Sequence, residues 1–349
     1  MNVNEIREKS RSVIGPYCKS CPVCNGKACS NKIPGPGSKG TGTVAIKNYE
    51  AWQKIEVKMD TLAENKEIDT TFEMFGKTFK YPIFAGPVGA VSQHYSDLYN
   101  DNTFNEIYVR ACAKSGIAAF TGDGLNEEIM VHATHYIKEN NGIGVPTIKP
   151  WDKETCFKKL ELAKASKAFA IAMDVDAAGL PFLQGRIPPA GRKSVAELKK
   201  IIDYAKVPFI VKGIMSVEGA QKAINAGAQG IVVSNHGGRV LDGTPATASV
   251  LEEIADQFKG QVKIIVDGGM TQVEIAYNVR EKLNVNVNIA GLAKNDKHET
   301  DALINGNTGE FIPLNHKSPL FFMLMRMQDE VHRFAISYHR HKREKSFFE

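Results

Sequence analysis

Several features that would narrow the function are missing from this chain of 349 residues. No apolar run approaches the roughly 20 residues that a membrane-spanning helix needs, and residues 1–11 are polar and charged rather than signal-like. No GxGxxG turn follows the first expected strand, which disfavours a doubly wound dinucleotide-binding sheet. The net charge of +5 is too small an excess to indicate nucleic acid. We therefore expect a cytoplasmic protein with neither a membrane nor a nucleic-acid partner.

What is present is the composition of an ordinary globular protein, with 43% hydrophobic and 24% charged residues. From residue 81 onward, short β-branched runs alternate with amphipathic helical patterns. The expected strands are 81–86, 117–121, 144–148, 168–174, 207–212, 228–234, 261–267 and 285–290. The expected helices are 104–115, 126–140, 154–166, 194–205, 216–226, 247–258, 272–283 and 319–337. Eight strands, each followed by a helix, predict a (β/α)8 TIM barrel of the α/β class.

The pattern divides the chain into three parts. Residues 1–80 form an N-terminal extension with a Cys-rich segment and a Gly- and Pro-rich stretch at 31–43, which we expect to be a loop over one barrel mouth. Residues 81–291 form the barrel, and residues 292–349 form an atypical, helical C-terminal segment.

The most informative segment is Ser234-Asn235-His236-Gly237-Gly238-Arg239, which directly follows the expected strand 228–234. Catalytic groups of a (β/α)8 barrel lie at the carboxyl ends of its strands, so this segment places an imidazole and a guanidinium at the catalytic face. Histidine exchanges a proton near neutral pH, and arginine binds carboxylates with a bidentate fork. The pair suits oxidation of a small carboxylate substrate.

This segment, with Phe209–Ile214 before it and Val266–Gly269 after it, resembles the FMN-dependent α-hydroxy-acid oxidase and dehydrogenase family, which includes glycolate and lactate oxidases. The resemblance covers about residues 40–269. It implies that His236 is the base facing the substrate α-carbon, that Arg239 anchors a 2-hydroxy carboxylate, and that Lys212 is the cation beside the flavin N1 edge. Asp174 falls near the family's aspartate on the fourth strand. A homo-oligomer stays open by analogy.

The same resemblance implies FMN as cofactor. The backbone of Pro87, Val88 and Gly89 would face the isoalloxazine ring, and further cofactor contacts would come from Lys212, Ser234, Asp267, Gly268, Gly269 and Gly291. The family's two phosphate-binding arginines are absent, since Gly269 precedes Met270-Thr271 and Gly291 precedes Leu292. Backbone N–H groups would then hold the phosphate alone, at a cost of about 1.5–3 kcal/mol per lost charge-assisted contact.

The substrate side also departs from the family. Its third strand ends in a Gln-x-Tyr pattern whose tyrosine binds substrate, whereas this chain has Ile148-Lys149-Pro150. The tyrosine of the family's N-terminal loop has no counterpart in 31–43 either.

From about residue 264 to 349 the chain resembles a second family, the RNase H-like nuclease domain of the UvrABC excinuclease C subunit. The resemblance rests on 289–298 and 328–340, and it implies that Asp267 binds metal and that His332 is catalytic. The first catalytic aspartate of that fold has no counterpart. The chain therefore reads as a chimera. The alternatives to an oxidoreductase are a fragment of a metal-dependent DNA-repair endonuclease and a catalytically inactive chimera.

Six cysteines fall into two groups. Cys112 and Cys156 lie in apolar helical patterns typical of a core. The other four are spaced closely as Cys18-x2-Cys21-x2-Cys24-x4-Cys29. In a reducing cytoplasm this crowding indicates a metal rather than disulfides, and both a [4Fe–4S] cluster and a structural zinc fit four thiolates. Surface thiols without a metal are the alternative.

Overall fold

The structure is a computed structural model. It describes residues 3–56, 62, 68–268, 290–294, 300–305 and 311–313. The chain divides into two compact units, Met1–Val279 and Arg280–Glu349. The domain boundaries predicted at residues 80 and 291 remain predictions, because this division into compact units does not test them.

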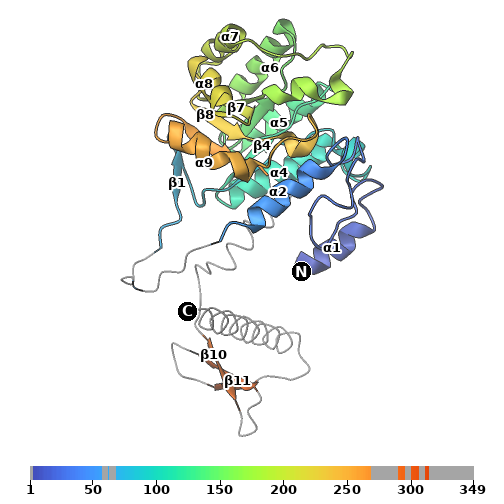
Figure 1. The fold of residues 1–349 in the computed structure, drawn as a ribbon, viewed down its shortest axis with the longest axis vertical. Coiled ribbons are helices and arrows are strands. Elements are labelled where there is room, and N and C mark those ends of the chain that lie inside the picture. Colours follow the sequence, from blue (N-terminus) through green and yellow to red (C-terminus); the bar gives the residue numbers. More distant parts are fainter. Residues whose placement is uncertain are drawn as a thin grey trace, which may run out of the picture. The chain divides into compact units, whose positions relative to one another are not determined.

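The first unit is built on a parallel sheet of seven strands that follow one another in chain order (Figure 1). The strands are β3 (Phe84–Ala85), β4 (Ala118–Thr121), β5 (Val145–Ile148), β6 (Ile171–Asp174), β7 (Phe209–Ile214), β8 (Gly230–Val233) and β9 (Lys263–Val266). Each strand pairs in parallel with the next. This is the arrangement of a TIM barrel, and the predicted fold class is confirmed. The expected eighth strand, 285–290, lies outside the described residues except for Ala290.

Helices connect successive strands, as the periodicity predicted. They are α4 (Asp101–Lys114), α5 (Glu128–Glu139), α6 (Lys153–Ala165), α7 (Val195–Ala205), α8 (Val217–Asn225) and α9 (Thr247–Phe258). Four of them, α4, α6, α7 and α8, have starts that are set locally, because the side chains of Asn100, Asp152, Ser194 and Ser216 each accept a hydrogen bond from a backbone N–H of the first turn. The helices expected at 272–283 and 319–337 lie outside the described residues.

The strands β4, β5, β6 and β8 are buried along their length because helices cover one face and the barrel interior faces the other. A hairpin of β1 (Phe72–Met74) and β2 (Lys77–Phe79) precedes the barrel. Its Phe79 packs against Phe84, which starts β3, and against Phe169, which precedes β6. The hairpin therefore covers the amino ends of the strands, and the candidate site lies at the opposite, carboxyl ends.

Two helices, α1 (Val3–Arg11) and α2 (Thr43–Gln53), lie before the barrel, and no helix or strand lies between them. The expected loop at 31–43 is thus irregular up to residue 42. It lies against the segment after β8, because Lys39 N donates to Gly238 O at 3.0 Å and Thr41 N donates to Asp242 Oδ2 at 2.7 Å. The Gly- and Pro-rich stretch therefore reaches the carboxyl ends of the strands.

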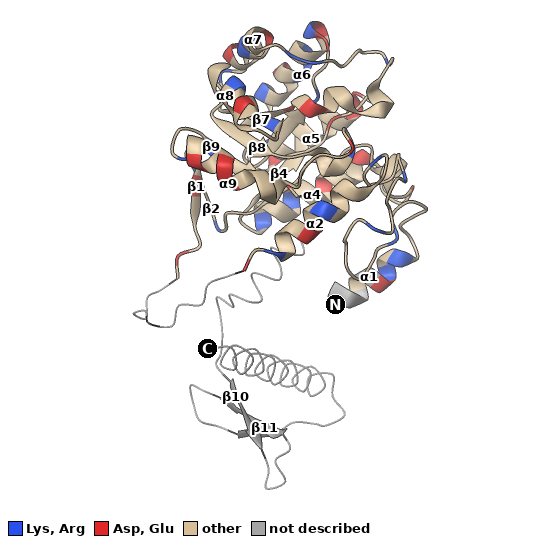
Figure 2. Cartoon of the chain, in the orientation of Figure 1, with Lys and Arg blue, Asp and Glu red and all other residues tan. Residues whose placement is uncertain are grey.

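The second unit contains an antiparallel sheet of β10 (Ala290–Lys294), β11 (Thr300–Asn305) and β12 (Phe311–Pro313). Figure 2 shows basic and acidic residues interspersed on the helices of the first unit, with no face of one sign in that view. Among the described residues no helix is long and apolar enough to cross a membrane.

Candidate active site

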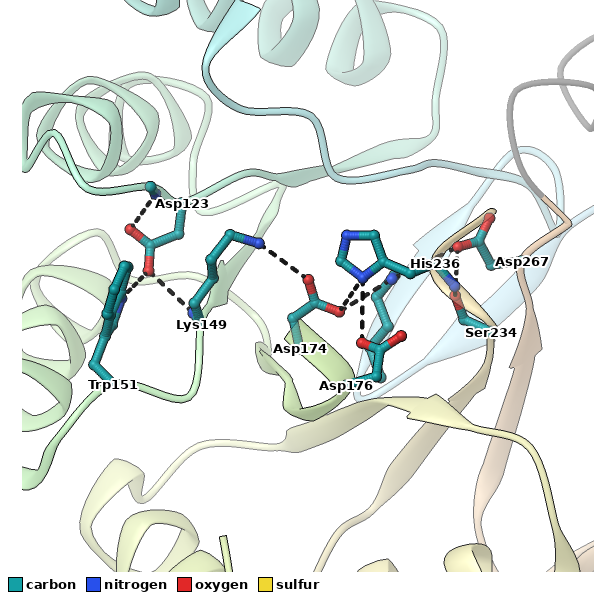
Figure 3. Close-up of polar contacts among 10 residues, drawn as sticks. Asp123, Lys149, Trp151, Asp174, Asp176, Ser234, His236 and Asp267 are labelled. Atoms are coloured by element: carbon teal, nitrogen blue, oxygen red, sulfur yellow. Dashed lines mark hydrogen bonds and ion pairs between the residues drawn. The ribbon is translucent and has the colours of Figure 1, made fainter. Parts of the chain in front are cut away.

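The carboxyl ends of β6, β7 and β8 bring one imidazole, one carboxylate and one ammonium group together (Figure 3). Asp174 ends β6 and pairs in register with Lys212 on β7, so the two side chains are neighbours by construction of the sheet. Lys212 Nζ lies 3.1 Å from Asp174 Oδ1, and His236 Nδ1 lies 3.5 Å from the same oxygen. The sheet thus joins predicted site residues that are far apart in the sequence.

The His236 ring contacts two carboxyl groups rather than one. Its Nδ1 lies 3.3 Å from Asp176 Oδ1, in addition to the contact with Asp174. Burial by itself lowers the pKa of His236, but the charge of Asp174, helped by Asp176, outweighs it and raises the pKa above the ordinary value. Burial and the neighbouring Asp174 raise the pKa of Asp176. The surroundings of His236 therefore favour its protonated form.

Lys212 is a buried cation, with a side chain only 3% exposed. Burial disfavours its charged form, yet Asp174 and Asp176 outweigh this and raise its pKa. Conversely, burial opposes ionisation of Asp174, but His236, Lys212 and Lys149 lower its pKa well below the ordinary value. The strand ends therefore carry fixed charges of both signs at neutral pH.

The turn that carries His236 is strained and tightly packed. His236, Gly237 and Gly238 all have positive φ, at 56°, 63° and 76°. A Cβ on Gly238 would lie 2.5 Å from Val44 Cβ and 2.6 Å from Ser38 Cβ, so the N-terminal segment leaves room only for glycine. The glycines of the sequence segment therefore serve the close approach of the chain before the barrel.

Asn235, next to His236, is fixed from the same direction. Its side-chain amide exchanges two hydrogen bonds of 2.9 Å with Asn48 of α2. Beside it, Ser234 Oγ donates to Asp267 Oδ2 at 2.8 Å, and Lys212 Nζ lies 3.7 Å from the same oxygen. Ser234 and Asp267, both predicted to contact cofactor, thus come together at the ends of β8 and β9.

Arg239 points away from these carboxylates toward the irregular loop. Its guanidinium donates to the carbonyl oxygens of Pro34, Gly35 and Gly37 and lies over the ring of Phe182, 5.7 Å from the centroid. Burial lowers its pKa. No ion pair of Arg239 occurs among the described residues.

His94, at the end of α3 (Val91–His94), lies in the same neighbourhood and escaped the sequence analysis. Its Nδ1 contacts the carbonyl oxygen of Pro34, and its ring packs on Phe182 at 5.8 Å between centroids. Burial and the cation of Arg239, helped by Lys149 and His236, lower its pKa to about 4. His94 is therefore a neutral imidazole in a region of positive potential.

The predicted flavin-facing turn, 87–89, packs on the end of β4. A Cβ on Gly122 would lie 2.3 Å from the carbonyl carbon of Val88, and one on Gly89 would lie 3.2 Å from Asp123 N. The hydroxyl of Thr121 beside this turn is buried and has no hydrogen-bond partner in the described part of the chain. Gly268 ends the described barrel segment, Gly269 lies outside it, and Gly291 lies in β10 of the second unit.

A second polar group, also missed in the sequence, fixes the end of β5. The buried carboxylate of Asp123 accepts hydrogen bonds from Trp151 Nε1 at 2.6 Å and from Lys149 N at 3.0 Å, and it forms an ion pair with buried Lys159. The backbone of Lys149 is thereby held, and its Nζ lies 3.4 Å from Asp174 Oδ2 (Figure 3). The lysine noted as a departure from the family therefore reaches into the site.

A family model described as FMN-dependent dehydrogenase matches residues 36–185 and 182–273, more than half of the chain. The chain belongs to this family. It is an oxidoreductase family, and the resemblance seen over about residues 40–269 is confirmed.

Solved structures agree on the fold of this chain. The lactate oxidase of Pediococcus acidilactici superposes with a TM-score of 0.58 at 24% identity, covering 76% of this chain and 75% of that one. A mandelate oxidase gives a TM-score of 0.60 at 21% identity, covering 76% and 78%. At these identities the likeness shows the (β/α)8 fold alone.

The residues at the ring end of the site fit the family's cofactor. They include the buried cation of Lys212 on β7, the buried hydroxyl of Thr121 at the end of β4, which has no hydrogen-bond partner among the described residues, and Gly89, which packs closely on Asp123. A cation and free hydrogen-bonding groups suit the edge of an isoalloxazine ring. Of the residues expected at the phosphate end, Gly269 lies outside the described residues and Gly291 lies in β10.

The C-terminal part of the chain matches a different model, the UvrC RNAse H endonuclease domain, over residues 251–336. UvrABC system protein C of Streptococcus pyogenes serotype M5 (strain Manfredo) is 54% identical over 86 residues. That match covers 24% of this chain and 14% of the relative, so the chain spans about a seventh of its curated relative. The two family matches overlap at 251–273, and the expected chimera is confirmed. His332 lies outside the described residues.

Among the described residues, one group of three side chains has metal-ligating atoms that all lie within 4.8 Å of one another, namely Asp174, Asp176 and His236. Lys149 and Lys212 already occupy both oxygens of Asp174, and such ammonium groups disfavour a divalent cation. The four N-terminal cysteines are partly buried, and no disulfide links any of the six cysteines.

Proposed function

We propose that this protein oxidises a small 2-hydroxy carboxylate, with His236 as the base and Arg239 as the carboxylate anchor. The observation that carries the proposal is the contact of His236, Asp174 and Lys212 at the carboxyl ends of three parallel strands in an FMN-dependent dehydrogenase barrel. Bound FMN would supply the two-electron acceptor.

His236 would act in its neutral form. Its carboxylate neighbours raise its pKa, so the base is strong once deprotonated, and the proton that it takes from substrate is stabilised by Asp174 and Asp176. Lys212 stays protonated because its pKa is raised, and it would stabilise negative charge on the reduced ring.

The contacts of Arg239 leave its charge and some of its N–H donors available, which supports the proposed role as carboxylate anchor. Its partners are neutral carbonyl oxygens, which leave its positive charge uncompensated and part of its donor set unused. A substrate carboxylate would pair with that charge beside the loop at 34–37. Neutral His94 beside it adds no competing charge.

The test is the visible absorption spectrum of protein purified without oxygen and then titrated with FMN. We expect the absorption bands of a bound flavin, which a panel of short 2-hydroxy acids bleaches under anaerobic conditions. A protein that stays colourless at saturating FMN would refute the proposal, because the exchanged phosphate end would then be unable to hold the cofactor. Bound flavin that no 2-hydroxy acid reduces would refute the substrate class alone.

We further propose that Cys18, Cys21, Cys24 and Cys29 bind one metal centre. Three of them lie near one another, since burial, followed by the charges of Cys18 and Cys21, raises the pKa of Cys29. The chain from Ser12 to Gly42 has no helix or strand to hold it, and such segments are commonly fixed by metal. The thiols must close further to share one ion, since no three of them meet within 4.8 Å.

Metal analysis of anaerobically purified protein tests this site. One zinc per chain without iron would assign a structural zinc, and iron with acid-labile sulfide would assign a cluster. The quadruple Cys→Ser variant should lose the metal, whereas Cys112→Ser should retain it. Metal-free wild-type protein would refute the site.

The match to the UvrC RNAse H endonuclease domain supports a second candidate function, metal-dependent cleavage of damaged duplex DNA. Asp267 would be a metal ligand and His332 the catalytic histidine. Nicking that requires Mg²⁺ or Mn²⁺ and disappears in His332→Ala would favour it, and absence of nicking at every metal concentration would exclude it.

A further inference from the structure

Asp174 lies within ion-pair distance of two lysines and of His236. Lys149 Nζ lies 3.4 Å from its Oδ2, while Lys212 Nζ lies 3.1 Å from its Oδ1. Both oxygens are therefore directed at ammonium groups. The oxygen that faces His236, Oδ1, is shared with Lys212, and Lys149 draws on the other oxygen of the same carboxylate.

His236 has a different nearest acceptor. Its Nδ1 lies 3.3 Å from Asp176 Oδ1, closer than the 3.5 Å that separates it from Asp174 Oδ1. One Nδ1–H group is directed fully at only one acceptor. Asp176 Oδ2 is buried and has no hydrogen-bond partner among the described residues, so Asp176 engages His236 and no other described donor.

The backbone holds Asp176 in this place. It lies in the first turn of η1 (Val175–Gly179), directly after β6. Gly213 on β7 has φ +104°, and a Cβ there would lie 2.6 Å from Asp176 Cγ. The carboxyl group is therefore packed against bare backbone, and its distance to the imidazole is fixed.

We propose that Asp176 is the positioning residue of His236 in this protein, and that Lys149 makes it necessary by engaging Asp174. The inference deepens the function proposed above and rests on His236 being the base. Lys149 adds one positive charge to the site and Asp176 adds one negative charge, so the two residues compensate each other.

The charged and titratable groups around His236 in the described part of the chain belong to this balance. They are Asp174 at the end of β6, Asp176 after it, Lys149 after β5, Lys212 on β7, Asp267 after β9, Arg239 in the turn after β8, and neutral His94 on α3. Removing Asp176 alone leaves an excess of positive charge beside the imidazole, and removing Lys149 alone leaves an excess of negative charge. Removing both restores the balance.

The experiment is an NMR titration of ¹⁵N-histidine-labelled full-length protein, without substrate. The His236 signal is assigned from its loss in His236→Gln. We expect Asp176→Asn to lower the pKa of His236 by about one unit, since an opposite charge at this range shifts a pKa by about 1–3 units. Lys149→Met should raise it, and the double variant should lie close to wild type. The control is Asp203→Asn, which removes an exposed carboxylate paired with Lys199.

An unchanged His236 pKa in Asp176→Asn would overturn the proposal and leave Asp174 as the sole partner. Should that variant fail to fold, a His236 pKa that does not rise in Lys149→Met overturns it equally. Restoration of the wild-type value by Asp176→Glu would support it. None of these readouts needs turnover, so a protein that oxidises no 2-hydroxy acid can still confirm the positioning of His236.

Discussion

The two sides of the site are anchored by different chemistry. On the β8 side, His236 follows Asn235, whose amide exchanges two neutral hydrogen bonds with Asn48 of a helix outside the barrel. On the β5 side, Lys149 is held by Asp123, a buried carboxylate that forms an ion pair with Lys159. The first side keeps the pattern of the family, and the second departs from it.

The difference teaches where each side is vulnerable. A neutral hydrogen-bonded pair loses modest free energy when one partner is removed. A buried ion pair loses far more, because the remaining charge stays in the interior without a partner. We therefore expect substitutions on the β5 side to lower the unfolding free energy more than substitutions on the β8 side. Variants on the two sides should separate effects on catalysis from effects on stability.

The largest effect is expected from His236→Ala, which removes the proposed base. Oxidation of the best 2-hydroxy acid should slow by about 10²–10⁴-fold, the usual contribution of a general base. Single-turnover reduction of bound flavin measures it. His135→Ala, on the exposed face of α5, is the matched control and should leave the rate unchanged. A rate within a factor of three of wild type would remove His236 from catalysis.

Asp123→Ala should have the largest effect on stability. It leaves Lys159 buried without its carboxylate and releases Trp151 and Lys149, so unfolding free energy should fall by about 3–5 kcal/mol. Urea denaturation followed by fluorescence measures it. Asp203→Ala removes an exposed ion pair and should cost less than about 1 kcal/mol. Equal losses in the two variants would show that the Asp123 pair is not an anchor.

The pH dependence of stability tests the cationic region around His94. Its pKa is about 4 in the folded protein against about 6.5 unfolded, so the unfolded chain binds the proton first as the pH falls. Stability should therefore fall between pH 6.5 and 4, by on the order of 2–3 kcal/mol from this group. His94→Gln should flatten that slope, whereas His132→Gln on α5 should not.

Asn48→Ala should have the smallest effect, about 1–3 kcal/mol of unfolding free energy, because it leaves Asn235 Oδ1 without its donor and the N–H of Thr247 without its acceptor. The exposed amide pair of Gln221 and Asn225 provides the control, and Asn225→Ala should cost only a few tenths of this. If Asn48→Ala lowered the unfolding free energy as much as Asp123→Ala does, the expected difference in stability between the β8 side and the β5 side would be wrong.

The sequence by itself determined the strands, the helices and the place of the chemistry. Alternation of β-branched runs with amphipathic stretches is a local property, so seven strands and six connecting helices were predicted within a few residues. The segment 234–239 follows a strand, and parallel strands share one catalytic edge, so His236 and Arg239 were predicted at the catalytic face. The chimera was equally readable, because its two halves carry different motifs.

Only the tertiary structure decided which groups these residues contact. Asp123 with Lys149, Asn48 with Asn235, and Arg239 with the carbonyls of 34–37 join segments separated by 26 to 205 positions. No local pattern distinguishes these side chains from ordinary polar residues. Their partners are set by the register of the sheet and by the packing of the N-terminal chain across the strand ends, and both are fixed only when the whole barrel closes around its core.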